Sequence, residues 1–403
     1  MSTETIEVTG HIVDSLVLAK ILDTIVDSGC DYEIEDVHIG KTSLDPSTAR
    51  IAVNGDEAVL TQLLDELQVH GANRTHQHDA RLVPVEQDGV LPAGFYSTTN
   101  LAADVRVDGT WLPVENPEMD CALVVADSRT YTAPMHRVRV GDQVVVGSDG
   151  VRVHAPSHAR DTQVFEFMAS EVSSEKPKAL LVTQVADRMR AARRRGGRVL
   201  VVAGPAVVHT GGATDLARLV AEGWVDLLFA GNGFATHDIE ADVLGTSLGV
   251  SVAEGKPTEG GHSNHLRVIN EVRRHGSIAA AVDAGYVTGG VMHACVRAGV
   301  PFVLGGSVRD DGPLPDVLSD TVAAADALRA QLGGVEVALM LASTLHAIAA
   351  GNCLPAGVET FCVDINQAVL TKLADRGSHQ ALGIVTDVGP FVGQLTNELL
   401  RGT

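Results

Sequence analysis

The amino-acid sequence predicts an α/β protein whose carboxyl-terminal part forms a doubly wound, mostly parallel β-sheet. Beyond residue 177 the chain alternates helical stretches with the short apolar runs RVLVVAG, WVDLLFAG, VPFVLGG, VALMLAS, TFCVDI and LGIVTDVG. Such runs are expected of parallel strands that helices cover on both faces. Two smaller modules precede this part. We therefore expect a ferredoxin-like α+β module over 1–78, a small β-rich module over 79–170 and the α/β domain over 176–403.

The amino-terminal module is predicted from the order of its elements. TIEVTGHI has the pattern of a strand, residues 15–27 that of an amphipathic helix, and DYEIEDVHIG and ARIAVNG those of two further strands. A second helix is expected over residues 56–69. Strand, helix, strand, strand, helix is the beginning of a ferredoxin-like unit.

The β-rich module is predicted from short alternating segments that turn signals separate. The expected strands are RLVPVE, DVRVDG, CALVVAD, HRVRVGD, QVVVGSDG and VRVHAP, between residues 80 and 156. A period of two indicates strands with one buried face. The polar segment SEVSSEKPK, residues 170–178, is the expected linker to the α/β domain.

Composition and charge exclude several classes of protein. The chain has 403 residues with 30 Lys and Arg against 51 Asp and Glu, and the net charge of −21 argues against a nucleic-acid-binding surface. Its five cysteines are odd in number and lack CxxC spacing, which indicates reduced thiols in the cytoplasm. No signal-peptide pattern and no membrane-length apolar stretch is present. We expect a soluble cytoplasmic protein with neither nucleic-acid nor membrane partners.

Small and polar residues follow the apolar strands of the α/β domain where each strand ends. In an open α/β sheet these ends meet at one edge, and ligands bind in the crevice outside them. The stretch from Phe229 to Asn264 is the richest, because an apolar run changes there to Gly231, Asn232 and Gly233 and then to many His, Asp, Glu and Thr residues. The others are GP at 204–205, GGSVRDD at 305–311, STLH at 343–346, DIN at 364–366 and TDVG at 386–389. Together they predict a nucleotide-binding crevice.

The glycine fingerprint of Rossmann domains is absent from this crevice. GNGFAT, residues 231–236, comes closest, but Thr236 stands where the fingerprint requires Gly or Ala. Turn glycines explain such a near-match as well as a cofactor does. The prediction of a dinucleotide site therefore depends on the whole set of strand ends, which is an argument from the fold.

Five ionisable residues are the candidates for catalysis. His237, Asp238 and Glu240 belong to HDIE, which we expect to open a helix, so they either face the substrate or complement the helix dipole. Lys256 is either an amine that anchors an anion or an exposed lysine. Asp387, in a glycine-rich turn after a strand, is the favoured acid–base group, with turn capping as the alternative.

No metal site is expected. His70, His76 and His78 lie close together in sequence, yet no cysteine joins them at zinc-finger spacing, which favours a polar loop. His262 and His265 can share one helix face, but no third ligand has a suitable spacing.

Three long runs of the α/β domain resemble the archaeal-type ornithine cyclodeaminase family. They are GPAVVHTGGATDLARLVAEGWVDLLFAGNGFATHDIE, GSIAAAVDAGYVTGGVMHACVRAGVPFVLGGSVRDDGPLPDV and FCVDINQAVLTKLADRGSHQALGIVTDVGPF. That family is related to the carboxyl-terminal half of the bifunctional arginine dihydrolase/ornithine cyclodeaminase. The amino-terminal part, with FYSTTN and MDCALVV, resembles the domain named after lysine-oxoglutarate reductase/saccharopine dehydrogenase, LOR/SDH. The arginine-dihydrolase catalytic domain has no counterpart in this chain.

The resemblance implies a deoxyhypusine-synthase-like NAD-binding fold and a reaction that converts L-ornithine to L-proline and ammonia. NAD would carry a hydride, be recycled and stay bound. The implied NAD contacts are Asn232, Gly233, Asp311, Ser343, Thr344, Leu345, His346, Asp364, Asp387 and Val388. By residue type and placement, and not from the resemblance, Asp387, Asp238 or Glu240 is a candidate to hold or deprotonate the δ-ammonium group of the substrate. Lys256 or Arg309 would bind its carboxylate.

Two alternatives to this reaction stay open. One is an NAD-dependent amino-acid dehydrogenase that acts on lysine or saccharopine-like substrates, as the name of the LOR/SDH domain suggests. The other is a non-catalytic NAD-binding sensor of amino acids. The preference for ornithine over lysine is also open, because one methylene in an apolar pocket is worth only about 1–3 kcal/mol. A homodimer or homotetramer is expected.

Overall fold

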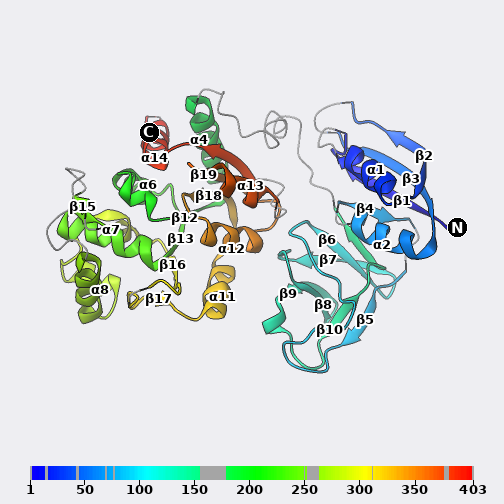
Figure 1. The fold of residues 1–403 in the computed structure, drawn as a ribbon, viewed down its shortest axis with the longest axis horizontal. Coiled ribbons are helices and arrows are strands. Elements are labelled where there is room, and N and C mark those ends of the chain that lie inside the picture. The colour runs from blue at the N-terminus through cyan, green and yellow to red at the C-terminus, as the bar shows by residue number, and fades with distance from the viewer. Residues whose placement is uncertain are drawn as a thin grey trace. The chain divides into compact units, whose positions relative to one another are not determined.

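The computed structural model falls into two compact units, each described here by itself (Figure 1). One comprises Met1–Glu171 with Asn352–Gly357, and the other Val172–Gly351 with Val358–Thr403. The structure describes residues 2–13, 17–41, 45–68, 70–75, 78–154, 178–248, 250–251, 263–310, 312–375 and 381–401. None of the helices among these residues is long and apolar enough to cross a membrane.

The first unit begins with two helices packed on a four-stranded antiparallel sheet. Its elements are β1 (Ser2–Gly10), α1 (Val17–Asp27), β2 (Asp31–His38), β3 (Ser47–Gly55), α2 (Glu57–Gln68) and β4 (Ala72–Arg74). The sheet has the order β2-β3-β1-β4. This is the βαββαβ arrangement of a ferredoxin-like unit, with β4 completing the pattern expected from the sequence. Apolar side chains of both helices and of β1 and β3 form its core, including Ile6, Ile21, Ile51 and Leu64.

The first unit continues with a seven-stranded sheet in the order β11-β6-β7-β9-β8-β10-β5. The strands are β5 (Arg81–Pro84), β6 (Ala103–Val107), β7 (Thr110–Glu115), β8 (Ala122–Ala126), β9 (Arg129–Ala133), β10 (Gln143–Val146) and β11 (Val151–Val153). All neighbours are antiparallel except β7 and β9. The two expected modules therefore have separate sheets within one compact unit, and the division at residues 78 and 79 stays a prediction.

One expected strand of this module is wrong. HRVRVGD, residues 136–142, forms a 3₁₀ turn over Met135–Arg137 followed by a loop. The backbone N–H of Arg139 donates to the Asp142 carboxylate at 2.8 Å, which closes a local turn in place of a strand ladder. The alternating valines are still explained, because Val138 is buried and Val140 is 62% exposed.

The second unit contains a seven-stranded sheet in which every neighbouring pair of strands is parallel. Its strands are β12 (Arg198–Ala203), β13 (Leu227–Gly231), β16 (Phe302–Gly305), β17 (Val317–Leu318), β18 (Val335–Leu341), β19 (Glu359–Asp364) and β20 (Ala381–Val385). The predicted α/β class and its parallel sheet are confirmed. The central strands β12 and β18 are almost wholly buried, as their apolar composition requires.

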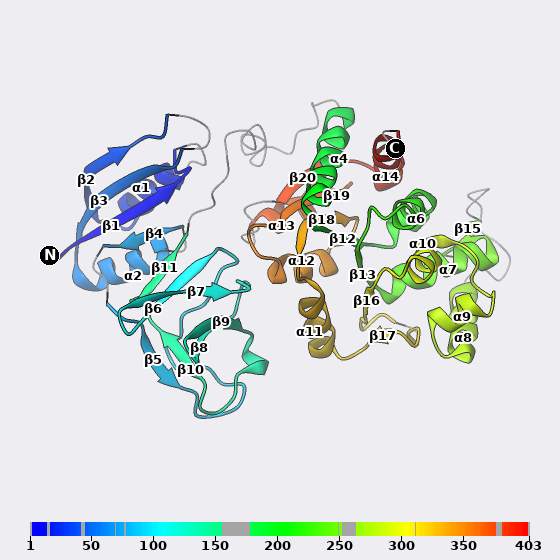
Figure 2. The ribbon, with the colours of Figure 1, turned by 180° about the vertical axis from the view of Figure 1, so that it is seen from behind.

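Helices cover both faces of this sheet (Figures 1 and 2). They are α4 (Lys178–Arg195), α5 (Ala206–His209), α6 (Ala213–Ala221), α7 (Asn232–Leu244), α8 (Asn264–His275), α9 (Ile278–Asp283), α10 (Gly290–Ala298), α11 (Thr321–Gln331), α12 (Leu345–Cys353), α13 (Gln367–Asp375) and α14 (Val388–Leu400). The figures show α4, α6 and α14 on one side of the sheet and α11, α12 and α13 on the other. A short hairpin, β14 (Thr246–Ser247) with β15 (Val250–Ser251), follows α7.

The strand order β17-β16-β13-β12-β18-β19-β20 places β12 and β18, the first and fifth strands of this sheet in chain order, side by side at its centre. Successive connections run outward from β12 in one direction and from β18 in the other. Right-handed crossovers then put the two sets of helices on opposite faces and leave a crevice between β12 and β18 at their carboxyl ends. The topology thus locates the site that the strand-end residues predict.

Gly204 and Ala342 directly follow these two central strands and approach each other closely. A Cβ atom on Gly204 would lie 1.8 Å from the carbonyl oxygen of Ala342, so only glycine fits. Ala342 has a positive φ of 47°, a conformation that L-residues adopt at some cost. The chain therefore accepts strain where the two halves of the sheet diverge.

The Gly204→Ala variant is expected to lower the free energy of unfolding by about 1–3 kcal/mol, because the added methyl group forces the two backbones apart. Urea unfolding followed by circular dichroism measures the change. Gly333→Ala is the matched control, since nothing lies within 4 Å of a Cβ atom at that position. Equal midpoints for the two variants would contradict this prediction.

Candidate active site

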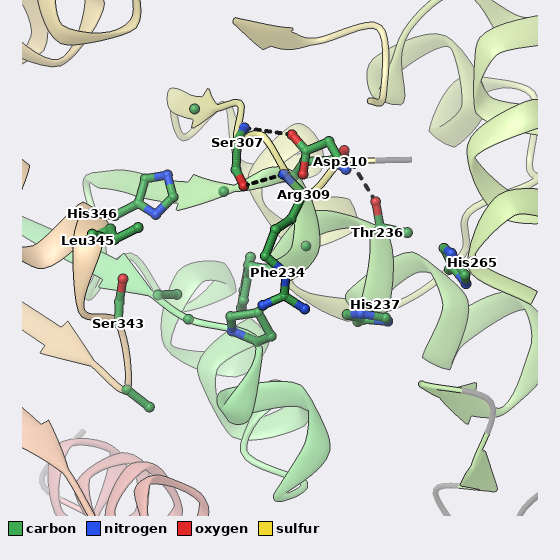
Figure 3. Close-up of a pocket in the computed structure, with 18 of the residues that line it drawn as sticks. Phe234, Thr236, His237, His265, Ser307, Arg309, Asp310, Ser343, Leu345 and His346 are labelled. Atoms are coloured by element: carbon green, nitrogen blue, oxygen red, sulfur yellow. Dashed lines mark hydrogen bonds between the residues drawn. The ribbon is translucent and has the colours of Figure 1, made fainter. Parts of the chain in front are cut away.

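A cavity of about 660 Å³ lies at the carboxyl ends of the central strands of the parallel sheet. The ends of β12, β13, β16 and β18 line it, together with the first turns of α7 and α12 (Figure 3). The α5 and α8 helices contribute His209, His265 and Ile269. This is the crevice at the topological switch point, where open α/β sheets bind their ligands.

Glycines at two strand ends make room for the ring of His346. A Cβ atom on Gly231 would lie 2.7 Å from Cε1 of His346, and one on Gly305 would lie 3.0 Å from its Nε2. Any larger residue at either position would displace the ring. Burial lowers the pKa of His346, although a hydrogen bond with the Gly305 backbone opposes the shift. The imidazole is therefore neutral near pH 7.

Backbone N–H groups at the start of α7 are available to a ligand in the cavity. Gly231 is the N-cap residue, has an extended backbone and makes no side-chain cap hydrogen bond. The side chain of Asn232 is turned inward, where its Oδ1 accepts from the backbone N–H of Leu314 at 3.0 Å. Asn232 thus holds the loop after β16 in place, while the first turn of the helix faces the cavity.

His237 and Glu240 form a hydrogen-bonded pair on α7. The Nδ1 atom of His237 lies 2.8 Å from Oε2 of Glu240, whose side chain is fully buried. Three residues apart on a helix, the two side chains share one face. His237 lines the cavity, whereas Glu240 is not among the lining residues. Oε1 of Glu240 accepts from the hydroxyl of Thr246 at 2.7 Å.

Two further histidines lie next to His237. The ring centroid of His209 is 5.1 Å from that of His237, and the centroid of His265 is 6.4 Å from it. The Nδ1 atom of His209 is 2.6 Å from the hydroxyl of Ser247. Partial burial is the main cause that lowers the pKa of His209, and the neighbouring His237 lowers it further. Glu240 acts in the opposite direction and raises it. One wall of the cavity therefore carries imidazole rings that can take up or release protons.

Among the described residues that line the cavity, Arg309 is the one with a permanent positive charge. Its loop is held by two local hydrogen bonds, from the Ser307 N–H to Asp310 at 2.8 Å and from the Arg309 N–H to the Ser307 hydroxyl at 3.0 Å. Figure 3 shows the guanidinium group extending toward Phe234 and His237. A planar guanidinium in this position is suited to pair with a carboxylate.

Comparisons with known proteins identify the chain at this point. The family model described as "Arginine dihydrolase ArgZ-like, C-terminal, Rossmann fold" matches residues 183–395, and the first region of the same carboxyl-terminal part matches residues 102–182. The "LOR/SDH bifunctional enzyme conserved region" matches residues 3–101. The chain is 50% identical over 402 residues to the ornithine cyclodeaminase of Methanopyrus kandleri, covering 99% of this chain and 97% of that protein. The chain belongs to the archaeal ornithine cyclodeaminase family.

Solved structures of longer relatives agree with this membership. The apo structure of ArgZ, an arginine dihydrolase of cyanobacteria, is 37% identical with a TM-score of 0.85, and the match covers 99% of this chain and 58% of that one. The ternary complex of AgrE with ornithine and NAD⁺ is 42% identical with a TM-score of 0.55, covering 100% of this chain and 58% of that one. The resemblance inferred from sequence is confirmed, and the expected homo-oligomer stays a prediction.

The structure of this family member brings some predicted site residues to the cavity and leaves others outside it. Asn232, Gly233, His237, Ser343, Thr344, Leu345 and His346 line it. Asp364, Asp387 and Val388 lie at the ends of β19 and β20 and are not among its lining residues. Asp364 accepts from the N–H of Asn366, and Asp387 caps α14 by accepting from the N–H of Gly389. Lys256, Asp311, His76 and His262 lie outside the residues that the structure describes.

The helix that HDIE was expected to open begins earlier. α7 starts at Asn232, directly after β13, so HDIE occupies the middle of the helix and complements no first-turn dipole. The reason is that Gly231, in extended backbone, already serves as the N-cap. Asp238 and Glu240 consequently project to different sides of the helix.

Asp238 lies on the side of α7 that packs against α10. Its carboxylate accepts from the backbone N–H groups of Val291 at 3.0 Å and Met292 at 2.8 Å, at the start of α10. Burial raises the pKa of Asp238 to about 6, even though these two hydrogen bonds lower it. This geometry favours helix capping, and Asp238 is not among the cavity residues.

His209 was not among the site residues that the sequence predicted. His209 ends the short helix α5 that follows β12, so its distance from a strand end was the available signal. Its approach to His237 depends on the tertiary arrangement of α5 and α7. The polar residues Thr246 and Asn264, both buried, were overlooked for the same reason.

The Asp238→Asn variant is expected to remove a pH dependence of stability. A pKa near 6 in the native state, against 3.8 for an ordinary aspartate, means that the native protein binds this proton more tightly than the unfolded chain. The contribution of Asp238 to the free energy of unfolding is therefore present at low pH and declines as the pH rises through 6. The wild type should gain about 1 kcal/mol relative to Asp238→Asn between pH 7 and pH 5.

Urea unfolding at the two pH values measures this difference. Asp320→Asn is the matched control, because Asp320 also caps a helix through two backbone N–H groups but is exposed. A stability difference between the wild type and Asp238→Asn that stays constant with pH would rule out the raised pKa.

Proposed function

We propose that the protein converts L-ornithine to L-proline and ammonia with NAD⁺ as a recycled hydride carrier. The observation that carries this proposal is the 50% identity to an ornithine cyclodeaminase along 99% of the chain, together with a cavity-lining histidine that is hydrogen-bonded to a buried carboxylate. AgrE, whose structure was solved with ornithine and NAD⁺, supports both ligands for this chain. The deoxyhypusine-synthase-like form of the NAD-binding domain is part of this proposal.

The residues present fit a dinucleotide. A cavity of about 660 Å³ is in the range of cofactor sites, roughly 300–1,000 Å³. Gly204, Gly231 and Gly305 keep the strand ends free of side chains, so a ligand can approach the backbone. The uncapped N–H groups of α7 are suited to a pyrophosphate.

We assign the cofactor to the strand ends that were predicted from sequence. Asn232, Gly233 and the turn Ser343-Thr344-Leu345-His346 would contact it through backbone and side chain. Asp364, at the end of the neighbouring strand β19, is a candidate for the ribose hydroxyls. Asp311, Asp387 and Val388 complete the proposed set.

The reaction is redox-neutral overall, and the two protons that the α- and δ-ammonium groups lose are returned to the departing ammonia and to the ring nitrogen of proline. NAD⁺, when bound, supplies a hydride acceptor for the α-carbon of ornithine and later a hydride donor to the cyclic imine. The δ-ammonium group must lose a proton before its nitrogen attacks the α-carbon. The departing α-nitrogen must gain one to leave as an ammonium ion. A single group that accepts and returns a proton can serve both events.

We propose His237 as that proton carrier. Glu240 accepts a hydrogen bond at Nδ1, so the lone pair of the neutral ring is on Nε2, the nitrogen that is not bound to the buried carboxylate. The carboxylate also stabilises the imidazolium ion that forms when the proton is taken up. Glu240 thereby acts through His237, Arg309 would bind the substrate carboxylate, and Phe234 and Ile269 would exclude water from the reacting carbons.

Incubation of the protein with NAD⁺ and L-ornithine is expected to give proline and ammonia in equal amounts without accumulation of NADH. Amino-acid chromatography, an ammonia assay and absorbance at the NADH band measure the three quantities. Steady release of NADH would instead support an amino-acid dehydrogenase. NAD⁺ binding without turnover of any basic amino acid would support a sensor.

The His237→Gln variant is expected to lower kcat by about 10²–10⁴-fold, which is the usual contribution of a general acid–base group. Binding of NAD⁺, measured by titration calorimetry, should be retained. His275→Gln is the matched control, since His275 lies at the far end of α8 beside Tyr286 and is not a cavity residue. A larger loss in Asp387→Asn than in His237→Gln would transfer the acid–base role to Asp387.

A further inference from the structure

The carboxylate of Glu240 is enclosed by polar side chains from other elements. Its side chain has no exposed surface, and a buried carboxylate remains ionised only if hydrogen bonds replace its lost hydration. His237 binds Oε2 from within α7. Thr246, from the hairpin strand β14, binds Oε1 at 2.7 Å.

Thr246 is linked in turn to the first residue of α8. The Nδ2 atom of Asn264 donates to the hydroxyl oxygen of Thr246 at 2.9 Å. Both side chains are buried, with 4% and 8% of their surfaces exposed. Gly245 brings Thr246 to this position, because its left-handed backbone, φ 65°, ends α7 and turns the chain back toward Glu240.

The direction of each hydrogen bond from Asn264 through Thr246 and Glu240 to His237 follows from the chemistry of the groups. The amide nitrogen of Asn264 only donates, so the Thr246 oxygen accepts from it and its single hydrogen is directed at Glu240. An ionised Glu240 only accepts, so the hydrogen of its other bond is on Nδ1 of His237. This series of hydrogen bonds therefore determines which nitrogen of His237 carries the hydrogen.

We propose that Thr246 and Asn264 are positioning residues that, through Glu240, hold His237 in the tautomer with a free Nε2. This inference rests on the proposed role of His237 as the proton carrier. The residues act from β14 and α8, outside the helix that carries the histidine, and make the proton-carrying geometry depend on the hairpin after α7. Among the residues that the structure describes, the other ionisable groups near the pair are His209 on α5, His265 on α8 and Arg309 on the loop after β16.

The Thr246→Val variant tests the proposal, because it removes the hydroxyl and keeps the shape of the side chain. We expect kcat to fall by about 10–100-fold, the effect of losing one hydrogen bond to a charged group. The KM for ornithine and the Kd for NAD⁺ should change less than about twofold, because Thr246 is not among the residues that line the cavity. Thr246→Ser should restore most of the activity. Asn264→Ala should lower kcat in the same direction by a smaller factor.

The pH profile separates positioning from a general loss of structure. Without the Thr246 hydroxyl, the Glu240–His237 pair binds a proton more tightly, so the acidic limb of the kcat profile should move to higher pH. Thr396→Val is the matched control: Thr396 is fully buried in the same domain, and its hydroxyl donates to the backbone oxygen of Asp215 at 3.3 Å. That control should leave both kcat and the profile unchanged.

A measurement without turnover makes the result independent of the proposed reaction. In protein labelled with ¹⁵N-histidine, the ring nitrogens of His237, assigned by comparison with His237→Gln, should report a hydrogen on Nδ1 in the wild type. Thr246→Val should shift them toward a mixture of tautomers. A Thr246→Val protein with wild-type kcat and tautomer would overturn the inference. Wild-type protein that shows the tautomer but makes no proline would overturn the proposed function alone.

Discussion

The close contact between Gly204 and the carbonyl oxygen of Ala342 is the constraint on which the site depends. It joins the ends of β12 and β18, the two strands from which the chain runs outward in opposite directions. Because Gly204 has no Cβ atom, the two strand ends can stay close to each other while the segments that follow them diverge. The cavity opens at this divergence, and glycines at the ends of β13 and β16 extend it along the sheet.

Two carboxylates on one helix show how surroundings assign roles. Asp238 and Glu240 are both buried and only two residues apart, so the helical period of 3.6 residues directs them to different sides of α7. Asp238 meets the free N–H groups of α10 and joins two helices. Glu240 meets Thr246 and the cavity-lining His237. The same residue type thus serves packing on one side and proton chemistry on the other.

Much of the parallel sheet could be predicted, because its buried strands are continuous apolar runs and end in small or polar residues. The same pattern predicted the cavity contributions of Gly231, Asn232 and the turn at 343–346. HRVRVGD was wrong because an alternating pattern does not distinguish a strand from a turn that buries one valine. The start of α7 was misplaced because Gly231 caps the helix without any of the usual cap side chains.

The sequence by itself determined the α/β class, the family and the strand ends, since these depend on local periodicity and on long runs of similar residues. Only the tertiary structure decided which polar groups meet. His209, His237, Thr246 and Asn264 come from four different elements, and their distances depend on how the helices pack on the sheet. The partner of a buried polar group is set by packing, because desolvation makes any available hydrogen bond valuable wherever in the chain it originates.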